Sequence, residues 1–401
     1  MKIARKVFAF FLLCCAQLIL FSSAQTPQKT GASSHYLAYV GTYTAKTNSK
    51  GIYAYRYDAA AGQLSPIGLA AESADPSFLA VHPSGKFLYA VNEAGKSSTV
   101  SAFQIDYATG KLALLNQVSA LGEDPCYISL DRTGKYVFVA NYSTGNVVVF
   151  PIGPDGKLGD ATSNVQDSGA LGPNKERQQA PHAHWIEASP DNRLVYVADL
   201  ALDRILIYGF DAANGTLSAW PPSGTGSHGG HANDVSVRLA PGAGPRHAVV
   251  SADGAHMYVL GELQSTVTEF DLLGTDNFIP VSSQKISALP QNFSGHNDAA
   301  EIALHPNGKF LYTSNRGNDS IAVFSVQRRR GTLKLVGIVP TGGKTPRHFA
   351  IDPSGNYLLV ENQESNNIVI FEIDSATGAL TPTGQVVQTP SPVDLTFVPA
   401  S

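Results

Sequence analysis

Two similar stretches of the sequence combine basic and acidic side chains at a fixed spacing. Residues 244–263 begin with Pro-Arg-His, cross a glycine turn and end with Glu262. Residues 345–363 repeat this pattern with Arg347 and Glu361. An Arg matches a carboxylate or phosphate with several fixed donors, and a Glu can take a proton from water. If both ends of such a stretch meet in space, they could bind an anion and activate a water molecule.

The segments that would position these residues form a repeat. A tight turn between two short apolar runs recurs at intervals of 49, 58, 62, 54 and 47 residues, at Gly85, Gly134, Asn192, Gly254, Gly308 and Gly355. A second turn recurs seven times, at Gly62, Gly110, Gly156, Gly215, Gly274, Gly331 and Gly378. Each unit therefore holds four strands, termed a to d. Four strands with a period near 50 residues are typical of a β-propeller blade.

The two ends of the repeat explain the unequal numbers of turns. The segment HYLAYVGTY, from residue 35, begins as a strand b, and PVDLTFVPA at the C-terminus has no strand after it. The last segment can therefore supply strand a of the first blade. The sequence predicts an all-β fold over residues 35–401: a seven-bladed β-propeller with four antiparallel strands per blade, closed by the C-terminal strand.

This topology gives the Arg and Glu positions a common location. Strands a and b are antiparallel, so the start of a and the end of b lie on the same rim. The residue types at these positions differ from blade to blade, which is typical of a central pocket to which each blade contributes one group. They are Ser77, Cys126, His184, Arg246, Ala300 and Arg347 in strand a, and Glu93, Tyr142, Leu200, Glu262, Arg316 and Asn362 in strand b.

Long connections are expected on that rim as well. Residues 159–181, 221–245 and 274–299 are predicted to be insertions between strand d and the next strand a, and such loops commonly cover a binding site. His228 and His231 have a spacing that could suit a metal ion, but no third ligand stands nearby. No metal and no other cofactor is expected.

Several motifs carry a family resemblance. PHAHW (181–185), GPRH with LGELQSTVT, SNRG and TPRHFAIDPSGNYLLVENQ make the chain similar to the lactonase family of seven-bladed propellers. That family includes bacterial 6-phosphogluconolactonases and fungal carboxymuconate cyclases. The resemblance implies a lactone opened by water without a metal. It implies a catalytic His that matches His182 or His184, together with Arg246, Glu262 and Arg316, and it places Glu301 and Arg347 near the pocket. We predict His184, Arg246, Glu262 and Arg316 as catalytic residues and His182, Glu301, Asn315 and Arg347 as substrate contacts.

The residue types suit that reaction, since hydrolysis needs a base for water and donors for the developing oxyanion. Either Glu262 or His184 could be the base, while Arg246 and Arg316 would bind the anion and polarise the carbonyl. A structural alternative exists for several of them. Arg246 and Glu262 could simply tie strands a and b together, one of His182 and His184 could be packed, and Asn315 could hold a loop.

Composition and the N-terminus limit the function further. The net charge is −4 and 15% of residues are charged, which argues against a nucleic-acid partner. Residues 1–24 have a basic start, an apolar stretch and small residues, as in a secretory signal peptide, and 25–34 form a polar, flexible lead. An uncleaved anchor is the alternative, although the apolar stretch is shorter than the roughly 20 residues of a membrane span. We expect an exported protein, periplasmic or secreted, without stable membrane insertion after cleavage, and monomeric or weakly oligomeric.

The predicted function is metal-independent hydrolysis of a small anionic lactone, as in 6-phosphogluconolactonases. Three alternatives remain open at this point. One is a lactonising cycloisomerase of the muconate type, the second is a calcium-dependent lactonase propeller, and the third is a non-enzymatic propeller that binds a ligand or protein.

Overall fold

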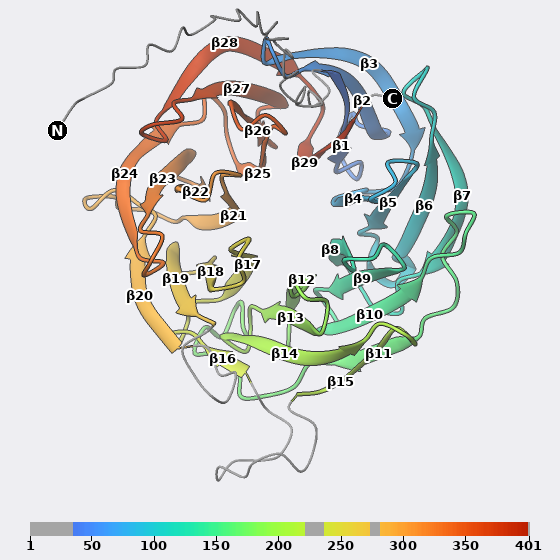
Figure 1. The fold of residues 1–401 in the computed structure, drawn as a ribbon, viewed down its shortest axis with the longest axis horizontal. Helices are drawn as coiled ribbons and strands as arrows, with labels where there is room; N and C mark the ends of the chain where they lie inside the picture. The colour runs from blue at the N-terminus through green and yellow to red at the C-terminus, as the bar shows by residue number, and fades with distance from the viewer. Residues whose placement is uncertain (1–34, 221–235, 273–280, 400–401) are drawn as a thin grey trace, which may run out of the picture. The chain divides into compact units, whose positions relative to one another are not determined.

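A computed structural model describes residues 35–220, 236–272 and 281–399. Within the compact unit Ser33–Ser401, seven antiparallel sheets are arranged around a common axis (Figure 1). The predicted seven-bladed propeller is therefore confirmed. The described residues contain a single short helix, the 3-10 turn Gly95–Ser97. None of their helices is long and apolar enough to cross a membrane.

From the axis outward, the first four sheets are β29 (Pro392–Pro399), β1 (His35–Thr42), β2 (Gly51–Asp58) and β3 (Gln63–Glu72); β4 (Leu79–Val81), β5 (Phe87–Asn92), β6 (Thr99–Ile105) and β7 (Leu112–Ser119); β8 (Pro125–Leu130), β9 (Tyr136–Asn141), β10 (Asn146–Pro151) and β11 (Ser163–Gln166); and β12 (Ala183–Ala188), β13 (Leu194–Asp199), β14 (Arg204–Asp211) and β15 (Thr216–Ala219), with β16 (Ser236–Arg238) also paired to β14. The other three are β17 (Pro245–Val250), β18 (His256–Gly261), β19 (Thr266–Asp271) and β20 (Val281–Ser287); β21 (Asp298–Leu304), β22 (Phe310–Arg316), β23 (Ser320–Val326) and β24 (Leu333–Pro340); and β25 (Pro346–Ile351), β26 (Tyr357–Asn362), β27 (Asn367–Ile373) and β28 (Leu380–Gln388).

The C-terminal strand closes the ring. β29 pairs antiparallel with β1, from Tyr36 opposite Pro399 to Thr42 opposite Pro392. The last segment of the chain thus supplies the innermost strand of the first sheet, as the repeat predicted. Closure pairs an edge that would otherwise be open for association with another chain.

The recurring turn between strands a and b has a clear backbone reason. All six residues at this turn have a positive φ, between 60° at Asn192 and 75° at Gly355. Glycine adopts this left-handed conformation without a Cβ clash, and Asn tolerates it better than most residues. The turn positions are therefore readable from sequence because only a few residue types fit them.

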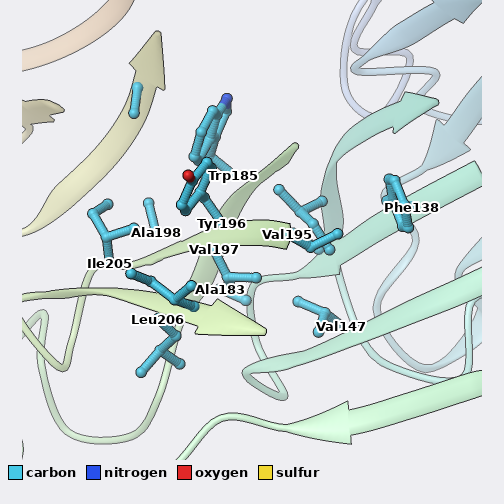
Figure 2. Close-up of a cluster of buried hydrophobic side chains, with 14 of the residues drawn as sticks. Phe138, Val147, Ala183, Trp185, Val195, Tyr196, Val197, Ala198, Ile205 and Leu206 are labelled. Carbon is cyan, nitrogen blue, oxygen red and sulfur yellow. The ribbon is translucent and has the colours of Figure 1, made fainter. Parts of the chain in front are cut away.

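Apolar side chains between neighbouring sheets form the core. Trp185 and Phe138, for example, are fully buried where the β12–β15 sheet packs on the β8–β11 sheet (Figure 2). Sheets covered on both faces need apolar residues on both, which explains near-continuous runs such as LVYVA in β13. This packing holds the innermost strands in place around the axis.

The bounds of the three predicted insertions were too wide, because each range contains a strand. β11 inside 159–181 and β20 inside 274–299 are the strands d expected after the turns at Gly156 and Gly274, whereas β16 inside 221–245 is a strand that the sequence did not indicate. The bounds were misplaced because such strands lack an apolar run, as in β11, where exposed and half-buried side chains alternate. Strands of this kind at the outer edge of a sheet bury little, so hydrophobic patterning is weak there. His228, His231, the predicted signal peptide and the flexible lead lie outside the described residues.

Candidate active site

The innermost strands carry a bulge at the position where the sequence placed functional residues. In β17, Pro245 pairs with Gly261 and His247 with Leu260, so Arg246 has no partner in β18. The same shift leaves His184 unpaired in β12 and Arg347 unpaired in β25. A bulge inserts one extra residue and re-aims a side chain. The bulge allows two consecutive side chains to lie close together. In β17, Arg246 Nη1 is at a distance of 3.2 Å from His247 Nε2.

Glu262 lies at the centre of a cluster of guanidinium groups. Its Oε2 is 3.1 Å from Arg246 Nε and 3.3 Å from Arg316 Nη2, while its Oε1 is 2.5 Å from Arg177 Nη2. The Nε of Arg246 has no well-aligned hydrogen bond, so its contact with Glu262 is an ion pair by distance. Arg246 instead donates through Nη1 to the carbonyl of Ala300. The structure thus brings three predicted catalytic residues together and adds a third Arg.

The cluster keeps Glu262 ionised. Burial by itself raises the pKa of this carboxyl, but Arg316, Arg246, His184 and Arg177 outweigh burial and hold the pKa well below its usual range. Burial and the nearby charges of Arg316 and Arg347 lower the pKa of Arg246 to about 10, so it too is charged at neutral pH. With both of its oxygens paired to cations, Glu262 is a weak proton acceptor in this state.

His184 has the opposite character. Burial, followed by the charges of Arg246 and His247, holds its pKa well below the ordinary value, so the imidazole is neutral. Its Nδ1 is buried and has no hydrogen-bond partner among the residues that the structure describes. The ring lies 5.1 Å from that of His247 and 5.5 Å from that of Tyr142, between centroids. The imidazole nitrogen is therefore available to accept a hydrogen bond, while burial and the neighbouring cations disfavour the protonated ring.

The two histidines of the PHAHW motif are in different environments. His182 stacks on Tyr142, with ring centroids 4.4 Å apart and planes 6° apart, and its Nδ1 lies 2.8 Å from the Tyr142 carbonyl oxygen. His182 is therefore packed against the strand end, while His184 faces the Arg cluster. The two side chains therefore differ in their contacts, and a catalytic role for either stays a prediction.

Arg347 differs from the other Arg residues of the cluster. Its guanidinium carbon lies 5.2 Å from the centre of the Tyr43 ring, a cation–π arrangement. Tyr43 in turn donates a hydrogen bond to Glu93 at 2.6 Å. Within the described part of the chain, Arg347 itself forms no hydrogen bond and no ion pair within 4.0 Å. Arg347 is half-buried. Burial alone would lower its pKa, but Tyr43 and Glu93 outweigh burial and raise the pKa, so Arg347 is a cation.

Glu301 belongs to a second, deeper polar network. Its Oε2 is 2.9 Å from His247 Nδ1 and 3.7 Å from His348 Nε2. His348 also contacts Glu361 at 2.9 Å and Asp394 at 3.2 Å. The Glu301 carboxylate therefore contacts histidines of two neighbouring strands, and among the described residues it forms no ion pair with an Arg of the cluster.

At two further positions of the predicted rim, Asn315 and Cys126, the surroundings favour a structural role. The Asn315 amide donates to the Ala288 carbonyl at 2.9 Å and accepts from Asn297 at 3.3 Å, so it holds the connection before β21. This matches the structural alternative for that residue. Burial raises the pKa of the Cys126 thiol well above its usual range, which argues against a nucleophilic thiolate.

Sequence reasoning missed Arg177. It lies in the connection between β11 and β12, outside the repeat, so no equivalent position in another blade drew attention to it. The available signal was the charged run Lys-Glu-Arg, residues 175–177, within a connection predicted to lie on the same rim. Besides Glu262, Arg177 contacts Asp298 at 3.6 Å.

Comparison with known proteins identifies the family. The model of the family described as "Lactonase, 7-bladed beta-propeller" matches residues 37–397. The chain belongs to this family. Among its relatives, a 6-phosphogluconolactonase of Bacillus subtilis is 36% identical over 78% of this chain and 84% of its own length. A 6-phosphogluconolactonase of Formosa agariphila is 34% identical over 78% and 85%.

A solved structure supports the same relationship. The periplasmic gluconolactonase of Pseudomonas aeruginosa is 33% identical, with a TM-score of 0.83 over 92% of this chain and all of that one. Membership of the family agrees with the resemblance found in the sequence motifs. The chain is accordingly a lactonase-family propeller, and lactone hydrolysis is the activity that its relatives' names share.

Proposed function

We propose that this protein hydrolyses a sugar lactone that carries an anionic group, such as a phosphate or a carboxylate. The observation that carries the proposal is the convergence of four guanidinium groups near one carboxylate. Three of them pair with Glu262, and the fourth, Arg347, forms no ion pair within 4.0 Å among the described residues. Arg347 lies close enough to disfavour the charge of Arg246 and of Arg316, while Glu93 and Asp298 are further carboxylates near the cluster. Guanidinium groups gathered in this way suit an anionic ligand.

The geometry suggests a division of roles. His184, neutral and with Nδ1 unpartnered, takes a proton from the attacking water. Arg246 and Arg316, oriented by Glu262, donate to the carbonyl oxygen as it becomes an oxyanion. Water adds to the carbonyl carbon, the ring C–O bond breaks, and the proton held by His184 passes to the departing ring oxygen. The product is the open hydroxy acid, and Arg347 holds the anionic group throughout.

We further propose that the chain acts outside the cytoplasm and without a metal ion. The signal-peptide pattern of residues 1–24 and the periplasmic relative from Pseudomonas aeruginosa support export. The 6-phosphogluconolactonase relatives make a phosphorylated gluconolactone the first substrate to test. A carboxylate-bearing lactone offers the same charge.

The test is a pH-stat assay of mature protein on a lactone panel, with and without EDTA. We expect hydrolysis that EDTA leaves unchanged, and a drop in kcat of about 100-fold for Arg246→Ala, a typical cost of losing one oxyanion donor. Arg193→Ala is the matched control, since Arg193 is exposed and pairs only with Asp191. Parent-like rates for Arg246→Ala on every lactone would show that this rim is not the site.

A further inference from the structure

The three guanidinium groups around Glu262 differ in their access to solvent. The side chain of Arg246 is 3% exposed and that of Arg316 is 16% exposed, whereas Arg177 is 33% exposed. Glu262 itself is only 4% exposed. Arg177 is therefore the most exposed of the three partners of the carboxylate, and its other contacts are with Tyr142 and Asp298.

The backbone beneath Arg177 is firmly anchored. The Asn174 side chain accepts hydrogen bonds from the backbone N–H groups of Glu176 and Arg177, at 3.0 and 3.1 Å. The buried Gln178 donates through Nε2 to the Leu200 carbonyl and to Asp203, at 2.9 and 2.8 Å. The turn thus presents Arg177 from a fixed base, and only the guanidinium needs to change partners.

We propose that Arg177 determines specificity by exchanging Glu262 for the anionic group of the lactone. This inference rests on the proposed function. A phosphate or carboxylate that reaches Arg177 offers the same paired oxygens that Glu262 offers, and a guanidinium binds either in a bidentate manner. Asp298, 3.6 Å from Arg177, stays a second partner of its guanidinium in both arrangements.

The exchange would also change Glu262. With Arg177 withdrawn, Glu262 keeps only Arg246 and Arg316, both of which it orients toward the carbonyl oxygen. A neutral lactone carries no group that competes with Glu262 for Arg177, so the Arg177–Glu262 pair stays intact when it binds. Discrimination between anionic and neutral lactones should therefore depend on this one side chain.

The experiment compares the parent, Arg177→Ala and Arg177→Lys on three lactones: 6-phosphogluconolactone, glucarolactone as the carboxylate case, and neutral gluconolactone. For Arg177→Ala we expect the ratio of kcat/KM, anionic over neutral, to fall about 10- to 100-fold, mainly through KM for the anionic substrate. Arg177→Lys should retain part of the ratio, because the charge remains and the bidentate geometry is lost. The comparison of 6-phosphogluconolactone with glucarolactone shows whether Arg177 selects a phosphate or a carboxylate.

Lys175→Ala is the matched control, because Lys175 is an exposed cation in the same turn. It should leave the ratio unchanged. An Arg177→Ala variant that slows all three lactones equally, or that changes none of them, would overturn the proposal.

Calorimetric titration with 6-phosphogluconate separates this inference from the proposed function. If Arg177→Ala binds 6-phosphogluconate more weakly than the parent, the role of Arg177 is supported even when no lactone is hydrolysed. The absence of hydrolysis would refute only the proposed hydrolase activity. Equal binding by parent and variant, or none by either, refutes the role of Arg177.

Discussion

At the scale of single residues, Glu262 organises the site by charge. It is the counter-ion of Arg177, Arg246 and Arg316, and its position just after β18 places it beside the bulged Arg246 of β17. The Arg246–Glu262 ion pair could have been a simple link between strands a and b. Instead it is one contact within a cluster of four charged groups. Removing the carboxylate would take away the shared counter-ion of three cations, and the two most buried of them, Arg246 and Arg316, would lose their ion pair with it.

We therefore expect Glu262→Gln to destabilise the fold by about 3 kcal/mol, in the range found when one partner of a buried ion pair is removed. Added sulfate should restore part of the loss, because the anion can bind the vacated guanidinium groups. Urea unfolding with and without sulfate measures both effects. Glu372→Gln, at an exposed position of β27, is the control. Equal midpoints for Glu262→Gln and the parent would contradict the role of Glu262.

At the scale of elements, the bulged innermost strand and the turn before it set the geometry of the site. The Gly244 N–H donates to Asp203 at 2.8 Å, and its carbonyl accepts from the Glu262 N–H at 2.8 Å. Gly244 has φ +60°, and a Cβ there would lie 2.6 Å from Cγ of Leu263. This glycine is required by both its conformation and its surroundings.

Gly244→Ala should therefore cost about 1–3 kcal/mol of stability and displace the end of β18. Because Glu262 follows that end, kcat on the best lactone should fall as well. Thermal unfolding and steady-state kinetics measure the two effects. In Gly337→Ala, the control, the new Cβ meets no atom within 4 Å and the backbone needs no left-handed φ. If both variants behave alike, the turn does not position the site.

At the scale of the whole propeller, a buried network spans the closure of the ring. His348 of β25 contacts Glu361 of β26 at 2.9 Å and Asp394 of the closing strand β29 at 3.2 Å. Burial alone would lower the pKa of His348, but Asp394, Glu361 and Glu301 raise it to about 9. Burial raises the pKa of Glu361 to about 7 and that of Asp394 to about 6. At a pH between their unfolded and folded pKa values, these three groups are therefore protonated in the folded protein and deprotonated in the unfolded chain.

The sign of the resulting pH dependence follows directly. The His348 contribution is complete below its unfolded pKa of about 6.5 and is lost as pH rises through about 9. The raised pKa of Glu361 acts in the same direction between about pH 4 and 7. We expect the midpoint of thermal unfolding to fall between pH 6 and 9, and to fall less in Asp394→Asn, which lacks one partner of His348. A midpoint that rises over this interval in the parent would contradict the account.

Much of the fold could be predicted because its determinants are local. Gly85 and its equivalents mark left-handed turns that few residues can form, and the alternation of apolar runs with these turns gives four strands per unit. The additional strand β16 was missed, and the ends of β11 and β20 were misplaced, because an edge strand buries too little to need an apolar pattern. The site was predicted in outline from Arg246, Glu262 and Arg316, whose rim positions follow from antiparallel pairing alone.

The seven-bladed ring, its closure by the last strand and the common rim of His184, Arg246, Glu262 and Arg316 could be read from the sequence, because turn conformation and strand pairing depend on near neighbours and a regular period. Three facts came from the three-dimensional structure: Arg177 pairs with Glu262, Arg347 forms no ion pair within 4.0 Å among the described residues, and His182 stacks on Tyr142 while the charge of Arg246 acts on His184. Those facts depend on a connection outside the repeat, on bulges that override alternation, and on charges that interact through space at distances unrelated to sequence.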